Sequence, residues 1–253
     1  MPLGPDIIIT NYTIDPTDMA EIAQPIVDWG VTIVAWGASA SDWTLGKEQA
    51  NLSACDYYTL GVQLGNSVCE LYPEPTKLGY LHWINSVNSI LLREKGFLDA
   101  LEKCPQITVI ADGDVPDPKS TAGFSDPNQT TSYTVDFIAQ HPDLNVIFAP
   151  WEYPAPGIEA AIKLSGLEGK IDIVTMDLGE TSYRQIRDGK TIKLTTGQAL
   201  YDAGRIMALT GAMAAAGLET PPFTIVPTFP VTKENLDDAW EYMHGPEIKP
   251  PAD

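Results

Sequence analysis

Short apolar runs alternate along the chain with longer segments in which apolar positions recur at helical spacing. In residues 18–29, for example, Met19, Ile22, Ala23 and Ile26 fall on one helical face. The runs predicted to form strands are residues 5–10, 32–36, 77–83, 107–112, 144–148, 171–177 and 191–197. Strands that alternate with helices predict βαβ units and a parallel sheet.

The segments between these runs complete an α/β pattern. Those predicted to be helical are residues 18–29, 56–71, 89–103, 131–140, 158–164, 181–187 and 201–216. Residues 223–231 are predicted to be extended, because their prolines exclude a helix. The predicted strands read as continuous apolar runs rather than alternating ones, which is typical of a parallel sheet covered by helices on both faces.

Polar and aromatic side chains directly follow most of the predicted strands. Proteins with parallel sheets bind their ligands beyond the carboxyl ends of the strands, so these positions form the candidate binding site. The candidate ligand-binding residues are Asn11, Asp15, Trp36, Asp114, Trp151, Glu152, Asp177 and Gln198. Carboxylates, amides and indole rings suit a neutral polyhydroxylated ligand, whose hydroxyls form hydrogen bonds while its ring stacks on tryptophan. A phosphate would instead require lysine, arginine or a glycine-rich cradle.

Each candidate also has a structural alternative. Asp177 could cap the helix predicted to follow it, Gln198 could serve as a structural amide, and the two tryptophans could pack in the interior. Turn or capping roles are expected for the remaining four, which are Asn11, Asp15, Asp114 and Glu152. Arg93 is interpreted as a solvated charge on its helix or as one that ties two lobes together, and a ligand role is a further alternative.

Composition narrows the range of partners. The 253 residues include 34 acidic and 15 basic side chains, which give a formal net charge of −19. This charge argues against binding of nucleic acid or of anionic membrane surfaces, both of which attract lysine and arginine. A hydrophobic content of 44% predicts a packed globular protein. The apolar runs are too short for a membrane span, and the start MPLGPDIIIT shows no signal peptide.

The sequence contains no pattern of an enzyme or of a metal site. GxSxG, HExxH, Walker A and GxGxxG motifs are absent, and the three histidines are scattered. Glu152 and Asp177 could face each other as hydrolase acids, but their spacing does not support this. No catalytic residue, metal or cofactor is therefore expected. The three cysteines lack CxxC spacing, and pairing of Cys55 with Cys69 in an oxidising compartment stays open.

Five spaced segments match the pattern of one protein family. They are residues 93–102, 139–166, 171–177, 186–189 and 195–208, with the sequences REKGFLDALE, AQHPDLNVIFAPWEYPAPGIEAAIKLSG, IDIVTMD, IRDG and TTGQALYDAGRIMA. In order and spacing they resemble the sugar-binding, ribose-type periplasmic binding proteins of ABC importers, which have the two-lobed type I fold. The resemblance implies a neutral sugar or polyol bound between two α/β lobes, an ABC transporter permease as partner, and a periplasmic or other extracytoplasmic location.

The resemblance also implies a division into lobes. The N-terminal lobe would comprise residues 1–84 and 199–222, and the C-terminal lobe residues 85–198 and 223–253, joined by a hinge that closes on the ligand. Two strand–helix units of the family are missing before residue 5. The N-terminal lobe is therefore expected to be incomplete and its first strand to lie at an exposed edge. A homodimer that covers this edge, or a misassigned start of the gene, would explain the difference.

Individual positions refine the expected ligand. Asp177 corresponds to the family's acidic ligand contact, and Gln198 to its amide contact at the hinge. Trp151 and Glu152 stand where ribose-type proteins usually carry an Asn–Asp pair, and Gly37 replaces a common aspartate. These departures imply a ligand other than ribose. Two alternative functions stay open, namely a ligand sensor of the same fold for a chemoreceptor, kinase or repressor, and a glycoside-acting enzyme.

Overall fold

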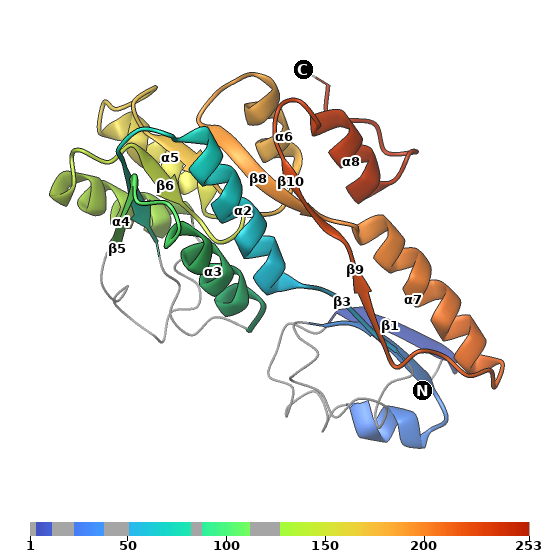
Figure 1. Cartoon of the computed structure of the whole chain (residues 1–253). Coiled ribbons are helices and arrows are strands. Elements are labelled where there is room, and N and C mark those ends of the chain that lie inside the picture. Colours follow the sequence, from blue (N-terminus) through green and yellow to red (C-terminus); the bar gives the residue numbers. More distant parts are fainter. Residues whose placement is uncertain (1–3, 12–22, 38–50, 82–87, 112–126, 253) are drawn as a thin grey trace. The chain divides into compact units, whose positions relative to one another are not determined.

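The computed structural model describes residues 4–11, 23–37, 51–81, 88–111 and 127–252. The chain divides into two compact units. The first comprises Met1–Asp56, Val87–Ser89 and Gln198–Pro227, and the second Tyr57–Ser86, Ile90–Gly197 and Thr228–Asp253. Each unit contains a sheet flanked by helices (Figure 1). The α/β fold with parallel sheets, which the alternation of strands and helices predicts, is confirmed.

A four-stranded parallel sheet forms the basis of the first unit. In spatial order its strands are β1 (Ile7–Asn11), β2 (Thr32–Trp36), β3 (Asn51–Cys55) and β9 (Phe223–Val226). Helix α7 (Leu200–Ala215) packs on the face that carries Val34, while the helical residues 23–28 pack against Ile33 and Ala35. Successive strand residues point to opposite faces, so β2 is apolar throughout because both of its faces are covered.

The strands of this sheet agree with the prediction at β1 and differ from it at β3 and β9. Strand β1 lies at the edge, as expected, and among the described residues it pairs with β2 alone. Residues 223–231, predicted as one extended segment, form two strands that belong to different sheets, β9 and β10 (Thr228–Val231). Strand β3 was not predicted, because its five residues NLSAC carry little apolar pattern.

The second unit contains a six-stranded sheet with the order β10-β8-β7-β6-β4-β5. The strands not yet described are β4 (Thr76–Tyr80), β5 (Ile107–Ala111), β6 (Val146–Phe148), β7 (Asp172–Val174) and β8 (Ile192–Gln198). These five strands pair in parallel. Their carboxyl ends therefore lie at one edge of the sheet, where parallel sheets bind their ligands.

Helices cover both faces of this sheet. Helix α3 (Asn88–Leu101) lies on one face, where Phe97 stacks on Phe148 with ring centroids 4.0 Å apart, and α2 (Tyr57–Leu71) packs against α3. The other face carries Ile147, which shares one core with four further helices. These helices are α4 (Pro127–Gln140), α5 (Ala155–Leu164), α6 (Glu180–Arg187) and α8 (Leu236–His244).

The boundary between the units differs from the division expected from the sequence. The division from the sequence assigned residues 57–84 to the N-terminal lobe and residues 223–227 to the C-terminal lobe. In the structure, Tyr57–Ser86 belongs to the second unit and Gln198–Pro227 to the first, where β9 pairs with β3. The physical reason is strand pairing: β4 pairs with β5 and β6, and α2 packs on β10. These contacts join segments that are distant in the sequence, and periodicity along the chain does not reveal them.

A disulfide bond joins Cys69 of α2 to Cys104, just after α3, with a Cα–Cα distance of 5.9 Å. The pairing of Cys55 with Cys69 that was left open is therefore wrong, and Cys55 is a buried thiol outside the disulfide bond. Cys69 lies near the C-terminal end of α2, beside the turn that follows α3. The bond thus fixes α2 relative to the helix that carries Arg93.

The close approach of α2 and α3 depends on a glycine. A Cβ atom at Gly61 would lie 2.0 Å from the backbone oxygen of Arg93. We expect Gly61→Ala to lower the free energy of unfolding by about 1–3 kcal/mol, because the two helix backbones must separate. Gly204→Ala in α7 is the matched control, since its added methyl meets no atom within 4 Å. It should raise the free energy of unfolding by about 0.5–1 kcal/mol. Urea denaturation measures both variants, and a stabilising Gly61→Ala would contradict the close packing.

Candidate functional site

The segment between β6 and α5 is a proline-rich corner at the carboxyl end of the second unit's sheet. Trp151 is half-buried there and packs against the core of that unit. Helix α5 begins after Pro154 and has Pro156 in its first turn, where the fixed φ of proline suits a helix start. The prolines therefore set the direction of the chain at this corner. The indole of Trp151 has a packing contact, and its role towards a ligand stays a prediction.

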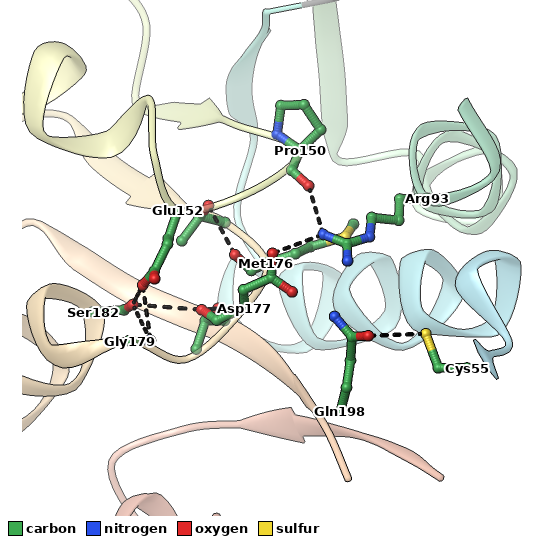
Figure 2. Close-up of polar contacts among 11 residues, drawn as sticks. Cys55, Arg93, Pro150, Glu152, Met176, Asp177, Gly179, Ser182 and Gln198 are labelled. Atoms are coloured by element: carbon green, nitrogen blue, oxygen red, sulfur yellow. Dashed lines mark hydrogen bonds and ion pairs between the residues drawn. The ribbon is translucent and has the colours of Figure 1, made fainter. Parts of the chain in front are cut away.

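Glu152 ties this corner to the beginning of α6. Its Oε2 accepts hydrogen bonds from the backbone N–H of Gly179, at 2.8 Å, and from the hydroxyl of Ser182, at 2.6 Å (Figure 2). Burial raises the pKa of the Glu152 carboxyl above its ordinary value, while the two hydrogen bonds oppose this rise. The carboxylate thus makes a structural contact, but with a segment 27 positions further along the chain rather than with the backbone of its own turn.

Arg93 and Asp177 form a largely buried ion pair. Nη1 of Arg93 lies 2.9 Å from Oδ2 of Asp177 and also donates to the backbone oxygen of Pro150 at 3.4 Å (Figure 2). The exposed fraction is 7% for the Arg93 side chain and 24% for that of Asp177. The guanidinium lies 5.3 Å from the ring centroid of Tyr57, within the range of a cation–π contact. The interpretation of Arg93 as a solvated charge is therefore wrong.

The spacing of Arg93 from two apolar residues indicates that it lies on a buried helix face. Arg93 follows Ile90 by three positions and precedes Phe97 by four, and both of these apolar residues are buried. Residues three or four apart share a helix face. Arg93 therefore lies on the buried face of α3, where an unpaired charge would be costly and a partner is required.

Asp177 itself has an uncommon backbone conformation. Its φ of 74° lies in the left-handed region, which residues other than glycine rarely adopt. The hydroxyl of Thr195 donates to its carbonyl oxygen at 2.6 Å, and Nε2 of His244 lies 2.9 Å from the carbonyl oxygen of Leu178. The residue at the N-cap of α6 is Gly179, so Asp177 does not cap this helix. Its carboxylate points towards Arg93 instead.

In the first unit, three predicted residues lie at the carboxyl ends of strands. Asn11 and Trp36 end β1 and β2 and are register partners, with Asn11 exposed and Trp36 half-buried. Gln198 ends β8 and is buried, and its Oε1 accepts a hydrogen bond from the thiol of Cys55 at 3.2 Å (Figure 2). Gln198 therefore has the structural contact that was one alternative. The ligand roles of all three residues stay predictions.

The structure thus brings Trp151, Glu152 and Asp177 together at one end of the second sheet, whereas Asp15 and Asp114 lie outside the described residues. Sequence reasoning missed the groups that contact Asp177, which are Arg93, Ser182 and Thr195, and the contact of His244 with the neighbouring Leu178. Within the described ranges, no cluster of His, Cys, Asp and Glu could hold a metal ion. None of the helices described there has the length and apolar character needed to cross a membrane.

Comparison with known proteins gives one family match. The model of a family described as "Periplasmic binding protein domain" matches residues 3–219. A search of curated proteins finds no match.

Several solved structures are similar to the chain. GanP, a glucose-galactose binding protein from Geobacillus stearothermophilus, is 21% identical with a TM-score of 0.72, over 93% of this chain and 79% of that chain. A periplasmic solute binding protein of an ABC transporter from Actinobacillus succinogenes, with bound D-allose, is 19% identical with a TM-score of 0.79, over 94% and 82%. A solute binding protein from Agrobacterium vitis, with bound allitol, is 15% identical with a TM-score of 0.73, over 94% and 79%. At these identities the similarity shows a shared fold.

Proposed function

Because this chain belongs to the family of periplasmic binding protein domains, we propose that it is the solute-binding component of an ABC importer with a neutral sugar or polyol as its ligand. The family consists of extracytoplasmic binding proteins rather than enzymes, in agreement with the expectation from the sequence. The ligand class and the roles of individual residues are the proposed part.

The observation that carries the ligand class is the Arg93–Asp177 ion pair. An arginine that holds a carboxylate in one orientation makes it a fixed acceptor for the hydroxyl groups of a sugar. The pair has no net charge, so a charged ligand would have to bury its own charge without compensation from the pair, which is costly. A neutral ligand with several hydroxyls therefore fits these groups best.

Two further observations support the ligand class. Trp151 presents a half-buried indole at the same end of the sheet as Asp177, and such a ring can stack on the apolar face of a sugar. Solved structures of the same fold contain D-allose and allitol, which are a neutral sugar and a neutral polyol.

The proposed location is the periplasm or another extracytoplasmic compartment. The Cys69–Cys104 disulfide supports this, because disulfides persist in oxidising compartments. The proposed partner is an ABC transporter permease, which would recognise the ligand-bound state that ligand contacts favour. A homodimer through the edge of β1 stays a prediction from the sequence, and light scattering of the purified protein tests it.

A thermal-shift screen tests the proposed function. The panel contains D-allose, D-galactose, D-glucose and allitol, with galacturonate and glucose 6-phosphate as anionic counterparts. A ligand that binds the folded state alone at a concentration of 100 Kd stabilises it by about 2.7 kcal/mol, so at least one neutral compound should raise the melting temperature. A rise with the anionic compounds alone would contradict the proposal, as would no rise with any compound.

A further inference from the structure

We propose that Glu152 is a positioning residue of the ligand site, whose carboxylate joins the Trp151 corner to the loop Asp177–Gly179 and so sets ligand affinity without touching the ligand. This inference rests on the proposed function, because it concerns a ligand bound at Asp177. It assigns to Glu152 a role that differs from the direct ligand contact considered from the sequence.

The geometry of Glu152 is that of a bridge between two chain segments. Both of its hydrogen bonds converge on Oε2, one from the backbone of Gly179 and one from Ser182. The carboxylate lies directly on the backbone of Gly179, since a Cβ atom there would come within 2.2 Å of Oε1. The hydroxyl oxygen of Ser182 also lies 3.4 Å from the carbonyl oxygen of Asp177. The corner and the loop are therefore linked by one side chain.

The loop needs such a link because Asp177 has an unfavourable backbone conformation. A left-handed aspartate costs of order 1–3 kcal/mol and persists only where its surroundings hold it. Thr195 holds the carbonyl oxygen of Asp177, His244 contacts that of Leu178, and Glu152 binds the N–H of Gly179. Without the Glu152 contact, the loop can relax and carry the Asp177 carboxylate away from its orientation towards Arg93.

The hydrogen bonds of Glu152 require an acceptor oxygen rather than a charge. The titratable groups that face its carboxylate are Asp177, which raises its pKa, and His244, which lowers it, while burial has the largest effect and raises it. A pKa raised by folding means that the stability from this group is present below its ordinary pKa and is lost as the pH rises through the raised value. Glu152→Gln keeps an acceptor oxygen without the buried charge, so this variant should not lower the melting temperature at pH 7.

The test compares Glu152→Ala with Glu152→Gln, and uses Glu159→Ala as a matched control. Glu159 of α5 also accepts a hydrogen bond from α6, from Nε2 of Gln185 at 2.5 Å, and another from Thr191, and both donors lie outside the Asp177–Gly179 loop. Titration calorimetry at 25 °C measures the Kd for D-allose, or for the neutral compound with the largest thermal shift if D-allose gives none. Hydrogen–deuterium exchange of the ligand-free protein measures protection of residues 177–183.

We expect Glu152→Ala to raise the Kd about tenfold or more, which corresponds to the loss of one hydrogen bond that holds the loop. Glu152→Gln and Glu159→Ala should stay within about twofold of the wild type, because each keeps the loop contact. Glu152→Ala should also exchange faster at residues 177–183. A purely structural role would lower the melting temperature of Glu152→Ala and leave its Kd unchanged, and that result would overturn the proposal.

Failure of the proposed function has a different outcome. If the wild type binds no neutral compound of the panel, the proposed function is wrong, and hydrogen exchange alone decides the role of Glu152. Faster exchange in Glu152→Ala, restored in Glu152→Gln, would still support the link between the corner and the loop. Unchanged exchange in Glu152→Ala would overturn it.

Discussion

The Asp177→Ala variant is expected to lose the ligand-induced rise in melting temperature completely. Asp177 supplies a carboxylate that Arg93 orients at the carboxyl end of β7, and its removal deletes the proposed acceptor for ligand hydroxyls. The variant should also be less stable by up to about 3–5 kcal/mol, because the buried guanidinium of Arg93 loses its charged partner. Thermal-shift measurements with and without the best neutral ligand of the panel check both effects.

Two controls separate binding from folding. Asp177→Asn tolerates the left-handed backbone and keeps an oxygen that can face Arg93, so it should fold. Its Kd should nevertheless rise about tenfold or more, because a charge-assisted hydrogen bond is lost. Asp172→Asn changes an aspartate at the opposite end of β7, which accepts a hydrogen bond from Tyr72, and should leave the Kd unchanged. Wild-type affinity in Asp177→Asn and Asp177→Ala would exclude Asp177 from the ligand site.

Removal of the Cys69–Cys104 disulfide is expected to have the second large effect. The bond closes a sequence separation of 35 residues, and the loss of this constraint on the unfolded chain corresponds to about 3–4 kcal/mol. The double variant Cys69→Ser/Cys104→Ser should therefore unfold at a clearly lower urea concentration than the wild type. Arg93 lies on the helix that the bond fixes, so the variant should also bind ligand less tightly.

The reducing agent TCEP provides the control for this prediction. It should destabilise the wild type to the level of the double variant and have no further effect on the double variant itself. The urea midpoint of Cys55→Ser should stay close to that of the wild type, because the serine hydroxyl can replace the thiol as hydrogen-bond donor to Gln198. Equal urea midpoints for the oxidised wild type and the double variant would contradict a stabilising role of the bond.

Most helices and strands of this chain could be predicted, because each depends on the spacing of apolar residues within its own segment. The run TIVAW at residues 32–36 is mostly apolar because helices cover both faces of β2. The burial of this strand can therefore be recognised from its sequence. The sequence of a strand does not show which other strand it pairs with. Residues 57–84 and 223–227 were therefore placed in the wrong unit.

The candidate site could be predicted in position but not in its internal contacts. The rule that ligands bind beyond strand ends selected Trp151, Glu152 and Asp177, which the structure brings to one end of the second sheet. The partner of Asp177 is Arg93, which is 84 positions away in the sequence, so no local pattern pairs the two. The disulfide partner of Cys69 likewise depends on how α2 packs against α3.

The structure also gives the APWEYP corner at residues 149–154 a second role. The stacking role of Trp151 towards a ligand stays a prediction, whereas the neighbouring Glu152 turns inwards to the start of α6. The corner therefore combines a candidate ligand surface with the contact that holds the Asp177 loop. A change at Glu152 should affect the ligand through this loop rather than directly.

Titration calorimetry of the ligand-free protein with neutral sugars and polyols tests the central claim most directly. The protein is first unfolded in guanidinium chloride, dialysed and refolded, so that any ligand retained from the cell is removed. The proposed function predicts saturable binding of one molecule per chain for at least one neutral compound, and no binding of galacturonate or glucose 6-phosphate. Saturable binding of the anionic compounds alone, or no saturable binding at all by a correctly refolded protein, would contradict it.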